Sequence, residues 1–281
     1  MIGAIIGDIV GSRFEFNNYK NKDFELFTDE CFVTDDSIMT LAVARAIMEA
    51  GKRKGHSDYI AKYAGDYYLL VADMTVKYMQ EIGRQYPNCG YGRMFMEWVF
   101  SDSPRAYNSF GNGAAMRISP VGFAARSEDE VKKLSHAVTA VTHNHPEGIK
   151  GAEAVALAIF MARNGASQTE IRDKINSSYY SLNFTIDAIR DNYKFDETCQ
   201  GTCPQAIEAF LESTSFEDAI RTAISLGGDS DTVAAITGSI AEAYYGVPPE
   251  IRDRALRYLD NELRAIYDEW TEFIGSPSVS F

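Results

Sequence analysis

The chain has 281 residues, of which 46% are hydrophobic and 24% charged, an ordinary balance for a globular protein. Its formal net charge of −13 argues against a nucleic-acid groove or an anionic membrane surface as partner, because each needs a basic face. A phosphate ligand stays open, since local amides and metal ions can outweigh the global field. With no long apolar span and no basic leading segment, we expect a cytoplasmic protein without a transmembrane helix or signal peptide.

Residues 7–15 predict a tightly packed helix. Gly7 and Gly11 stand four positions apart in an apolar run, and Glu15 follows Asp8 by seven residues, two helical turns along the same face. On these residues alone, Glu15 could equally be a surface carboxylate with a helical neighbour. The polar residues 17–33 predict a surface loop.

A second helix is expected from about Asp36, where an apolar run begins behind Thr34 and Asp35. Thr, Asp and Ser are good N-cap residues, but capping needs one oxygen and four consecutive side chains offer oxygens here. Two adjacent carboxylates at a helix start can also be explained by the helix dipole.

A helical pattern then covers residues 56–91, with a short aromatic helix at 91–100, and their aromatic stripe indicates core. The next motif is Gly111-Asn112-Gly113, which precedes a short helical run and exposes backbone amides at its start. Such amides suit an anion such as a diphosphate, although an ordinary turn has the same pattern. The spacing matches neither a Walker A loop nor G-x-G-x-x-G.

Further helices are expected at 127–141, 149–163, 168–180, 204–211, 215–226 and 249–266, with an irregular stretch at 183–201 and a loose end at 275–281. His143-x-His145 is a weak metal motif, and a ligand-contacting loop is the favoured interpretation. Cys199 and Cys203 lack the partners of a zinc site, so the four cysteines are expected to be reduced thiols.

The stretch from Gly227 to Thr232 leads into a nearly apolar run, 233–246, whose one charge is Glu242. This pattern predicts a buried helix. Two carboxylates at the start of a buried helix, Asp229 and Asp231, would be costly without a positive partner, and a metal ion is the simplest candidate.

Two short acidic runs thus precede two apolar helices, and their starts meet if the helices pack side by side. Oxygen ligands without histidine or thiolate favour Mg²⁺, Mn²⁺ or Ca²⁺. Four carboxylates suit two divalent ions, with Asp231 as the natural bridge. The expected ligands are Thr34, Asp35, Asp36, Asp229, Asp231 and Thr232.

Two other motifs are disfavoured. The D-x-D-x-T run at Asp229 occurs in haloacid-dehalogenase-type phosphatases, but there it follows a buried strand. An EF-hand loop fails because Val233 and Ala234 occupy the positions of a ligand and of the turn glycine. Strand patterns, repeats and linkers are absent from the sequence, so we predict one all-α domain over residues 1–281.

Taken together, these stretches resemble the ADP-ribosylglycohydrolase family, in its compact bacterial branch. The matching segments are 7–12 with Glu15, 34–37, 111–117, 142–143 and 227–232, in the family's order; Ser37 stands where the family often has threonine. The resemblance implies an orthogonal all-helical domain whose cleft holds two Mg²⁺ or Mn²⁺ ions. By position, Thr34, Asp35, Asp36 and Asp231 would hold one ion, and Asp229, Asp231 and Thr232 the other.

The resemblance also implies substrate contacts and an activity. Residues 111–113 would cradle the diphosphate, Phe110 would stack on adenine, and His143 would line the same pocket. Glu15 and Asp231 would be catalytic, with Glu15 either an acid/base group or a gate. The expected enzyme is a metal-dependent monomeric hydrolase that releases ADP-ribose from an ADP-ribosylated protein or small conjugate. A silent ADP-ribose binder and a magnesium phosphatase are the alternatives, and the linkage cleaved (arginine, serine, guanidine, base or O-acetyl) stays open.

Overall fold

The computed structural model describes residues 1–54, 62–63 and 66–275, and this part of the chain is helical, which confirms the predicted all-α class. Its β-structure is limited to one isolated bridge between Gly111 and Thr198. None of the described helices has both the length and the apolarity needed to cross a bilayer. The four cysteines are free thiols, as expected.

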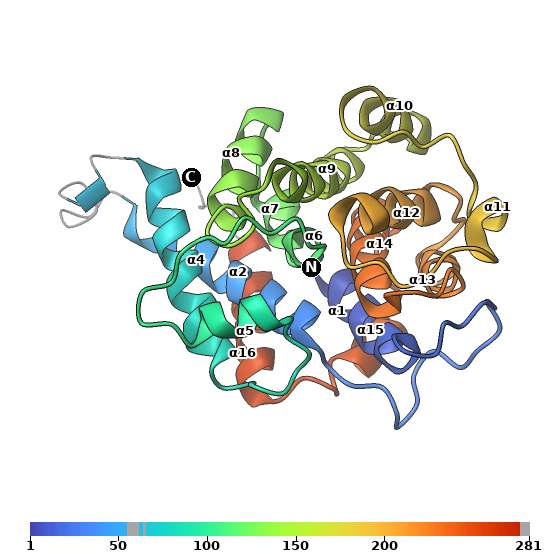
Figure 1. Cartoon of the computed structure of the whole chain (residues 1–281), viewed down its shortest axis with the longest axis horizontal. Helices are drawn as coiled ribbons and strands as arrows, with labels where there is room; N and C mark the ends of the chain where they lie inside the picture. The colour runs from blue at the N-terminus through green and yellow to red at the C-terminus, as the bar shows by residue number, and fades with distance from the viewer. Residues whose placement is uncertain (55–61, 64–65, 276–281) are drawn as a thin grey trace.

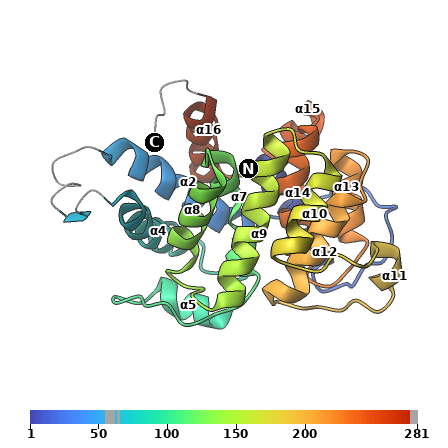
Figure 2. The same ribbon diagram turned by 90° about the horizontal axis from the view of Figure 1, so that it is seen from above.

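The elements follow one another as α1 (Ile2–Gly11), η1 (Ser12–Phe14), α2 (Asp35–Arg53), α4 (Tyr67–Gly83), α5 (Arg93–Val99), α6 (Gly113–Met116), α7 (Ser119–Ala124), α8 (Glu128–Thr139), α9 (Pro146–Arg163), α10 (Gln168–Ser178), α11 (Ile186–Arg190), α12 (Cys199–Leu211), α13 (Phe216–Ile224), α14 (Ser230–Tyr245), α15 (Pro249–Ala255) and α16 (Asn261–Gly275). Figures 1 and 2 both place α2, α4, α5 and α16 on one side of the molecule and α10 to α13 on the other, with α9 and α14 between them.

The centre of the fold is the pairing of α1 with α14, the most extensive helix contact in the described chain. Every residue of α1 is buried. Glycines let the two backbones approach closely: a Cβ on Gly7 would lie 2.0 Å from the carbonyl oxygen of Ala234, and one on Gly11 would lie 2.5 Å from Cα of Asp231. The first helix therefore fixes the position of the residues that begin α14.

The helix expected over 249–266 is two helices, α15 and α16, and three further helix boundaries differ from the sequence prediction. In place of a helix over 56–91, α4 begins at Tyr67, because Asp66 is extended and accepts hydrogen bonds from the first-turn amides, and it ends at Gly83. Residues 55–61 and 64–65 of that prediction lie outside the described residues, as does most of the loose end at 275–281. Helix α14 begins at Ser230, so Asp231 belongs to its first turn.

The stretch from 183 to 201 is the third difference. It contains the short helix α11 and the first turn of α12, which begins at Cys199 and not at Pro204. Thr198 caps α12 by accepting a hydrogen bond from the amide of Gly201, 3.1 Å away. Proline inside a helix removes one backbone hydrogen bond, and here the cap and the burial of α12 outweigh that loss.

Candidate active site

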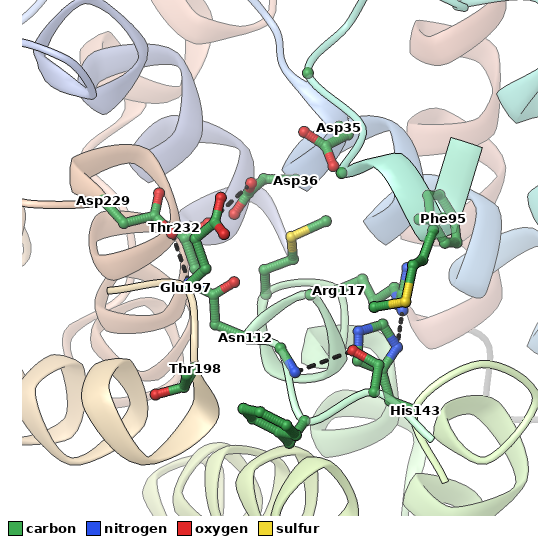
Figure 3. A pocket seen from close by; sticks show the side chains of 18 of the residues that line it. Asp35, Asp36, Phe95, Asn112, Arg117, His143, Glu197, Thr198, Asp229 and Thr232 are labelled. Atoms are coloured by element: carbon green, nitrogen blue, oxygen red, sulfur yellow. Dashed lines mark hydrogen bonds between the residues drawn. The ribbon is translucent and has the colours of Figure 1, made fainter. Parts of the chain in front are cut away.

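A pocket of about 400 Å³ opens where α2, α6 and α14 begin. It is lined by the predicted site residues Glu15, Asp35, Asp36, Phe110, Gly111, Asn112, Gly113, His143, Asp229, Asp231 and Thr232, together with Phe95, Arg117, Phe195, Glu197 and Thr198 among others. In Figure 3 the carboxylates of Asp35, Asp36 and Asp229 lie along one side of the pocket, and Arg117 and His143 lie across from them. Thr34 is buried just behind this wall.

The starts of α2 and α14 are in direct contact. The hydroxyl of Thr232 donates a hydrogen bond to Oδ2 of Asp36, 3.1 Å away. Asp229 is held in place by its own segment: Gly227 and Gly228 both have a φ of +70°, a conformation that glycine adopts without strain. The amide of Gly228 also donates to Oδ1 of Asn18, which ties the polar loop to this turn.

A carboxylate outside the predicted ligand set, Asp8 of α1, organises the start of α2. It is fully buried and accepts hydrogen bonds from the hydroxyl of Thr34 (2.6 Å), the amide of Thr34 (3.1 Å) and the amide of Ser37 (3.2 Å). Thr34 in turn caps α2 through the amide of Asp36. The Thr34 hydroxyl therefore bonds both Asp8 and its own helix.

Two overlapping groups of carboxylates form the acidic side of the pocket. Asp8, Asp36 and Asp231 can bring one oxygen each within 4.8 Å of one another, and so can Glu15, Asp229 and Asp231. Asp231 belongs to both groups. Asp35 lines the pocket beside them but belongs to neither group.

The pKa values of these carboxyls reflect their crowding. Burial, reinforced by the neighbouring carboxylates, raises the pKa of Asp36 and of Asp231 well above the ordinary value. Burial raises the pKa of Asp8 to about 6, and burial together with Asp229 raises that of Glu15 to about 7. Deprotonating the whole group at neutral pH thus requires a compensating positive charge.

The donor set fits a hard divalent cation. All its ligand atoms are oxygens, and Oδ1 of Asp36 is buried without a hydrogen-bond partner in the described part of the protein. A buried carboxylate oxygen with no donor is costly, and a metal ion would satisfy it. Carboxylates and hydroxyls favour Mg²⁺ or Mn²⁺ over softer ions.

The Gly-Asn-Gly loop is anchored to the segment that begins α12. The amide of Asn112 donates to the carbonyl of Glu197 (2.7 Å), and the amide of Cys199 donates to the carbonyl of Phe110 (2.9 Å). The side-chain amide of Asn112 donates to Oδ2 of Asp229 at 2.6 Å. This loop therefore connects the carboxylate groups with the start of α6.

The two histidines of the H-x-H motif have separate roles. His143 is buried against the pocket, with Nδ1 2.8 Å from the guanidinium of Arg117. His145 instead caps α9 by accepting a hydrogen bond from the amide of Glu147. Neither histidine belongs to the two clusters of carboxylates described above. Burial and the neighbouring Arg117 hold the pKa of His143 well below its ordinary range.

Sequence reasoning missed several residues of this pocket. Asp8 had a signal, being the lone charge in an otherwise apolar and glycine-containing run. Arg117 ends the Gly-Asn-Gly segment, and its burial could not be read from the sequence. Phe195 and Glu197 carried no signal, because their place in the pocket depends on the pairing of residues 110–112 with 197–199.

Comparisons with known proteins agree with the geometry. The model of the family described as ADP-ribosylglycohydrolase matches residues 1–275. An ADP-ribosylarginine hydrolase of Pseudomonas putida (strain GB-1) is 30% identical over 274 residues, which cover 89% of this chain and 71% of that protein. ADP-ribosylhydrolase ARH3 of Homo sapiens is 26% identical over 323 residues, covering 88% and 84% of the two chains.

The glycohydrolase of Rhodospirillum rubrum that acts on ADP-ribosyl-(dinitrogen reductase) is 25% identical over 219 residues, covering 76% of this chain and 69% of that protein. Among solved structures, a chain of an ADP-ribosylglycohydrolase-related protein complex superposes with a TM-score of 0.64 and 22% identity, and the match covers 97% of each chain. That structural likeness shows the shared fold.

Proposed function

The chain belongs to the ADP-ribosylglycohydrolase family, and from that premise we propose that it is a metal-dependent hydrolase that cleaves ADP-ribose from a guanidino group of a modified target. As a member of this family it is an ADP-ribosyl glycohydrolase, an enzyme that hydrolyses a glycosidic bond. The metal requirement, the linkage and the individual residue roles are the proposal. A single observation carries it: two carboxylate groups share Asp231, and all their members except Asp8 line the same pocket as the Gly-Asn-Gly loop.

We assign two Mg²⁺ or Mn²⁺ ions to the acidic side of the pocket. Thr34, Asp35, Asp36 and Asp231 would hold one ion, with Asp8 behind them, and Asp229, Asp231 and Thr232 would hold the other, with Glu15 nearby. When bound, such ions supply Lewis-acid activation of a water molecule and a grip on the ribose hydroxyls. The chain's own contribution is positioning, because these ligands come from helix starts fixed by the α1–α14 contact.

The rest of the pocket would bind the ADP moiety. Backbone amides at the start of α6 suit a diphosphate. The amide of Asn112 already donates to the carbonyl of Glu197 and that of Gly111 to the hydroxyl of Ser109, so this assignment depends first on the amide of Gly113. Phe110 is 42% exposed at the pocket wall, where its ring is available to stack on adenine. His143 would line the same part of the pocket.

The reaction develops positive charge on the ribose, and the carboxylates stabilise that charge. Glu15 is half-buried beside Asp229 and Asp231, so its carboxyl lies within the group of side chains that would surround the reacting atoms. It would protonate the leaving nitrogen or take a proton from the attacking water.

The guanidino linkage is favoured by the charge of the pocket. Carboxylates of Asp35 and Glu197 line it in addition to the two carboxylate groups, whereas Arg117 is a buried cation at its far side. A cationic guanidino leaving group is attracted to such an acidic mouth, and a neutral serine is not. The P. putida relative is named as an ADP-ribosylarginine hydrolase, and arginine carries a guanidino group.

The test measures ADP-ribose release from arginine-linked and serine-linked substrates side by side, with Mg²⁺ and with a chelator. We expect faster release from the arginine linkage, and no release with the chelator or in Asp231→Asn. Asp129→Asn is the matched control, since Asp129 also stands in the first turn of a helix but is exposed and paired with Lys133. Full activity of Asp231→Asn, or turnover in chelator, would overturn the metal-dependent mechanism. A preference for the serine linkage would overturn the substrate assignment alone.

A further inference from the structure

Arg117 is an unusual cation for this protein because it is fully buried without a carboxylate partner. Only 2% of the residue is exposed, and it makes no salt bridge within the described chain. Its guanidinium lies 4.8 Å from the ring centroid of Phe95, and its Nε is buried without a hydrogen-bond partner. A buried charge without a charged partner costs desolvation free energy, so the remaining contacts of Arg117 should indicate what the residue does.

Those contacts are made to His143 and to the residue before it. One terminal nitrogen of Arg117 lies 2.8 Å from Nδ1 of His143 and 3.1 Å from the hydroxyl of Thr142. The hydroxyl itself lies 2.8 Å from the same Nδ1. Figure 3 shows the guanidinium and the imidazole facing each other across this contact.

The chemistry of arginine determines the tautomer of this histidine. A guanidinium has only donors, so Nδ1 of His143 must be the acceptor and cannot carry a proton. A neutral imidazole has one proton, which therefore resides on Nε2. The doubly protonated ring is excluded for the same reason, since it would place an N–H against an N–H.

The surroundings of the ring agree with a neutral histidine. Tyr107 is the aromatic neighbour, with ring centroids 5.9 Å apart, and Arg117 is the nearest charge. Asp35 and Asp36 act on Arg117 through space and face it from the acidic side. Within the described chain no carboxylate contacts His143 and none would favour its cation.

The free nitrogen points at the Gly-Asn-Gly loop. A Cβ added to Gly113 would lie 3.4 Å from Nε2 of His143, and one added to Gly111 would lie 3.5 Å from it. In the described part of the chain, Nε2 makes no hydrogen bond, whereas Nδ1 makes two contacts. The unpartnered N–H therefore faces the place where the proposed function puts the ADP moiety.

We propose that Arg117 is a positioning residue that locks His143 as the neutral Nε2–H tautomer, so that the pocket presents a permanent hydrogen-bond donor to an acceptor of the ADP-ribosyl group. The ligand part of this statement rests on the proposed function, whereas the tautomer lock does not. A charge-neutral donor keeps its hydrogen bond at every pH at which the fold is stable. The opposite tautomer would present a lone pair, which repels phosphate oxygens and ring nitrogens alike.

The first experiment is nitrogen NMR of the ligand-free protein labelled at histidine, with His143→Gln used to assign the signal. We expect an Nδ1 resonance of the unprotonated type and an Nε2 resonance of the protonated type, both unchanged from about pH 5.5 to about pH 8. His136, which is exposed and lies outside the pocket, gives a second imidazole signal in the same spectra and serves as a reference for the assignment. An Nδ1–H signal, or ordinary titration of His143, would overturn the lock.

The second experiment measures ADP-ribose affinity by calorimetry at several pH values, as the ratio of variant to wild type. Arg117→Met should weaken binding about five- to tenfold near neutral pH, with the ratio improving as the freed imidazole protonates. Arg117→Lys should restore affinity and the NMR pattern, because an ammonium also has only donors. His136→Gln should bind like wild type. Arg117→Met with wild-type affinity at every pH would refute the positioning role.

The two outcomes separate the inference from the proposed function. If the NMR pattern is as expected but ADP-ribose neither binds nor is released, the lock stands and the proposed function fails. If the enzyme releases ADP-ribose but His143 titrates freely, the function stands and the lock fails. Because the spectra of the wild-type protein decide the tautomer, misfolding of Arg117→Met cannot rescue the proposal.

Discussion

Substituting Gly11 by alanine should damage the metal site through the backbone. The added Cβ would lie 2.5 Å from Cα and 2.7 Å from N of Asp231, and 2.7 Å from the carbonyl oxygen of Ser230. These are backbone atoms at the start of α14, so no side chain can move aside. Restoring ordinary contact requires α1 and α14 to separate by about 1 Å at this point.

The magnitude follows from what Asp231 does. Overpacking of this kind costs about 1–3 kcal/mol of unfolding free energy, and for a chain of this size each kcal/mol lowers Tm by about 2–4 °C. Asp231 belongs to both carboxylate groups, so a shift of about 1 Å should lower kcat about a hundredfold and raise the Mg²⁺ concentration needed for half-maximal activity.

Gly3→Ala is the matched comparison for this variant. Its Cβ would lie 2.1 Å from the carbonyl oxygen of Gly238, an equally severe clash between the same helices but two turns away from the ligands. Two measurements distinguish the variants: thermal unfolding, and ADP-ribose release as a function of Mg²⁺ concentration. Both variants should have a lower Tm, and only Gly11→Ala should lose the stimulation of ADP-ribose release by Mg²⁺ below its Tm. A Cβ on Gly275 would meet no atom of the described residues within 4 Å, so Gly275→Ala should change neither property. Equal metal response in the two clashing variants would refute the idea that α1 positions Asp231.

Three further predictions concern the same pocket. Asp8→Asn should lower the free energy of unfolding by about 1–3 kcal/mol in urea titrations, because the new side-chain amide would place N–H donors against the donors of Thr34 and Ser37. Unchanged stability would contradict the role of Asp8 as the acceptor at the start of α2. Folding raises the pKa of Asp8 to about 6 and those of Glu15 and Asp35 to about 7, so the folded protein binds protons more tightly than the unfolded chain. In the presence of a chelator, Tm should therefore fall as pH rises from about 4 to about 7, and added Mg²⁺ should restore it. A Tm that rises over this range would contradict the burial of these carboxyls. Phe110→Ala should weaken ADP-ribose binding by about 1–3 kcal/mol in calorimetry, while Phe100→Ala, equally exposed but outside the pocket, should not; equal effects would argue against stacking.

The helical class and most of the acidic residues could be read from the sequence because their signals are local. A run such as Thr34-Asp35-Asp36 before apolar residues marks a helix start and offers more oxygens than a cap needs. Two such runs made a meeting of helix starts the natural hypothesis, and in the structure Thr232 contacts Asp36 directly. Their roles as metal ligands stay predictions.

What the sequence could not supply depends on contacts between distant segments. Asp8 looked like a neighbour of Glu15 along one helix, but its partners are the amides at the start of α2. Glu197 reaches the pocket because its segment pairs with the Gly-Asn-Gly loop, and no local pattern encodes that pairing. Pro204 predicts a helix start because proline favours the first helical position, yet the cap at Thr198 begins the helix five residues earlier, at Cys199.

The contact between α1 and α14 also sets the order in which the protein can be completed during synthesis. Gly3 and Glu242, which are hydrogen-bonded across this contact, are 239 positions apart in the sequence. At ribosomal speeds of about 5–20 residues per second, the first helix waits on the order of ten to fifty seconds for its main partner to emerge. During that time a helix whose every residue is buried in the folded protein lacks its largest contact surface. We therefore expect the nascent chain to need chaperone protection, and the purified protein to refold slowly and to aggregate at high concentration.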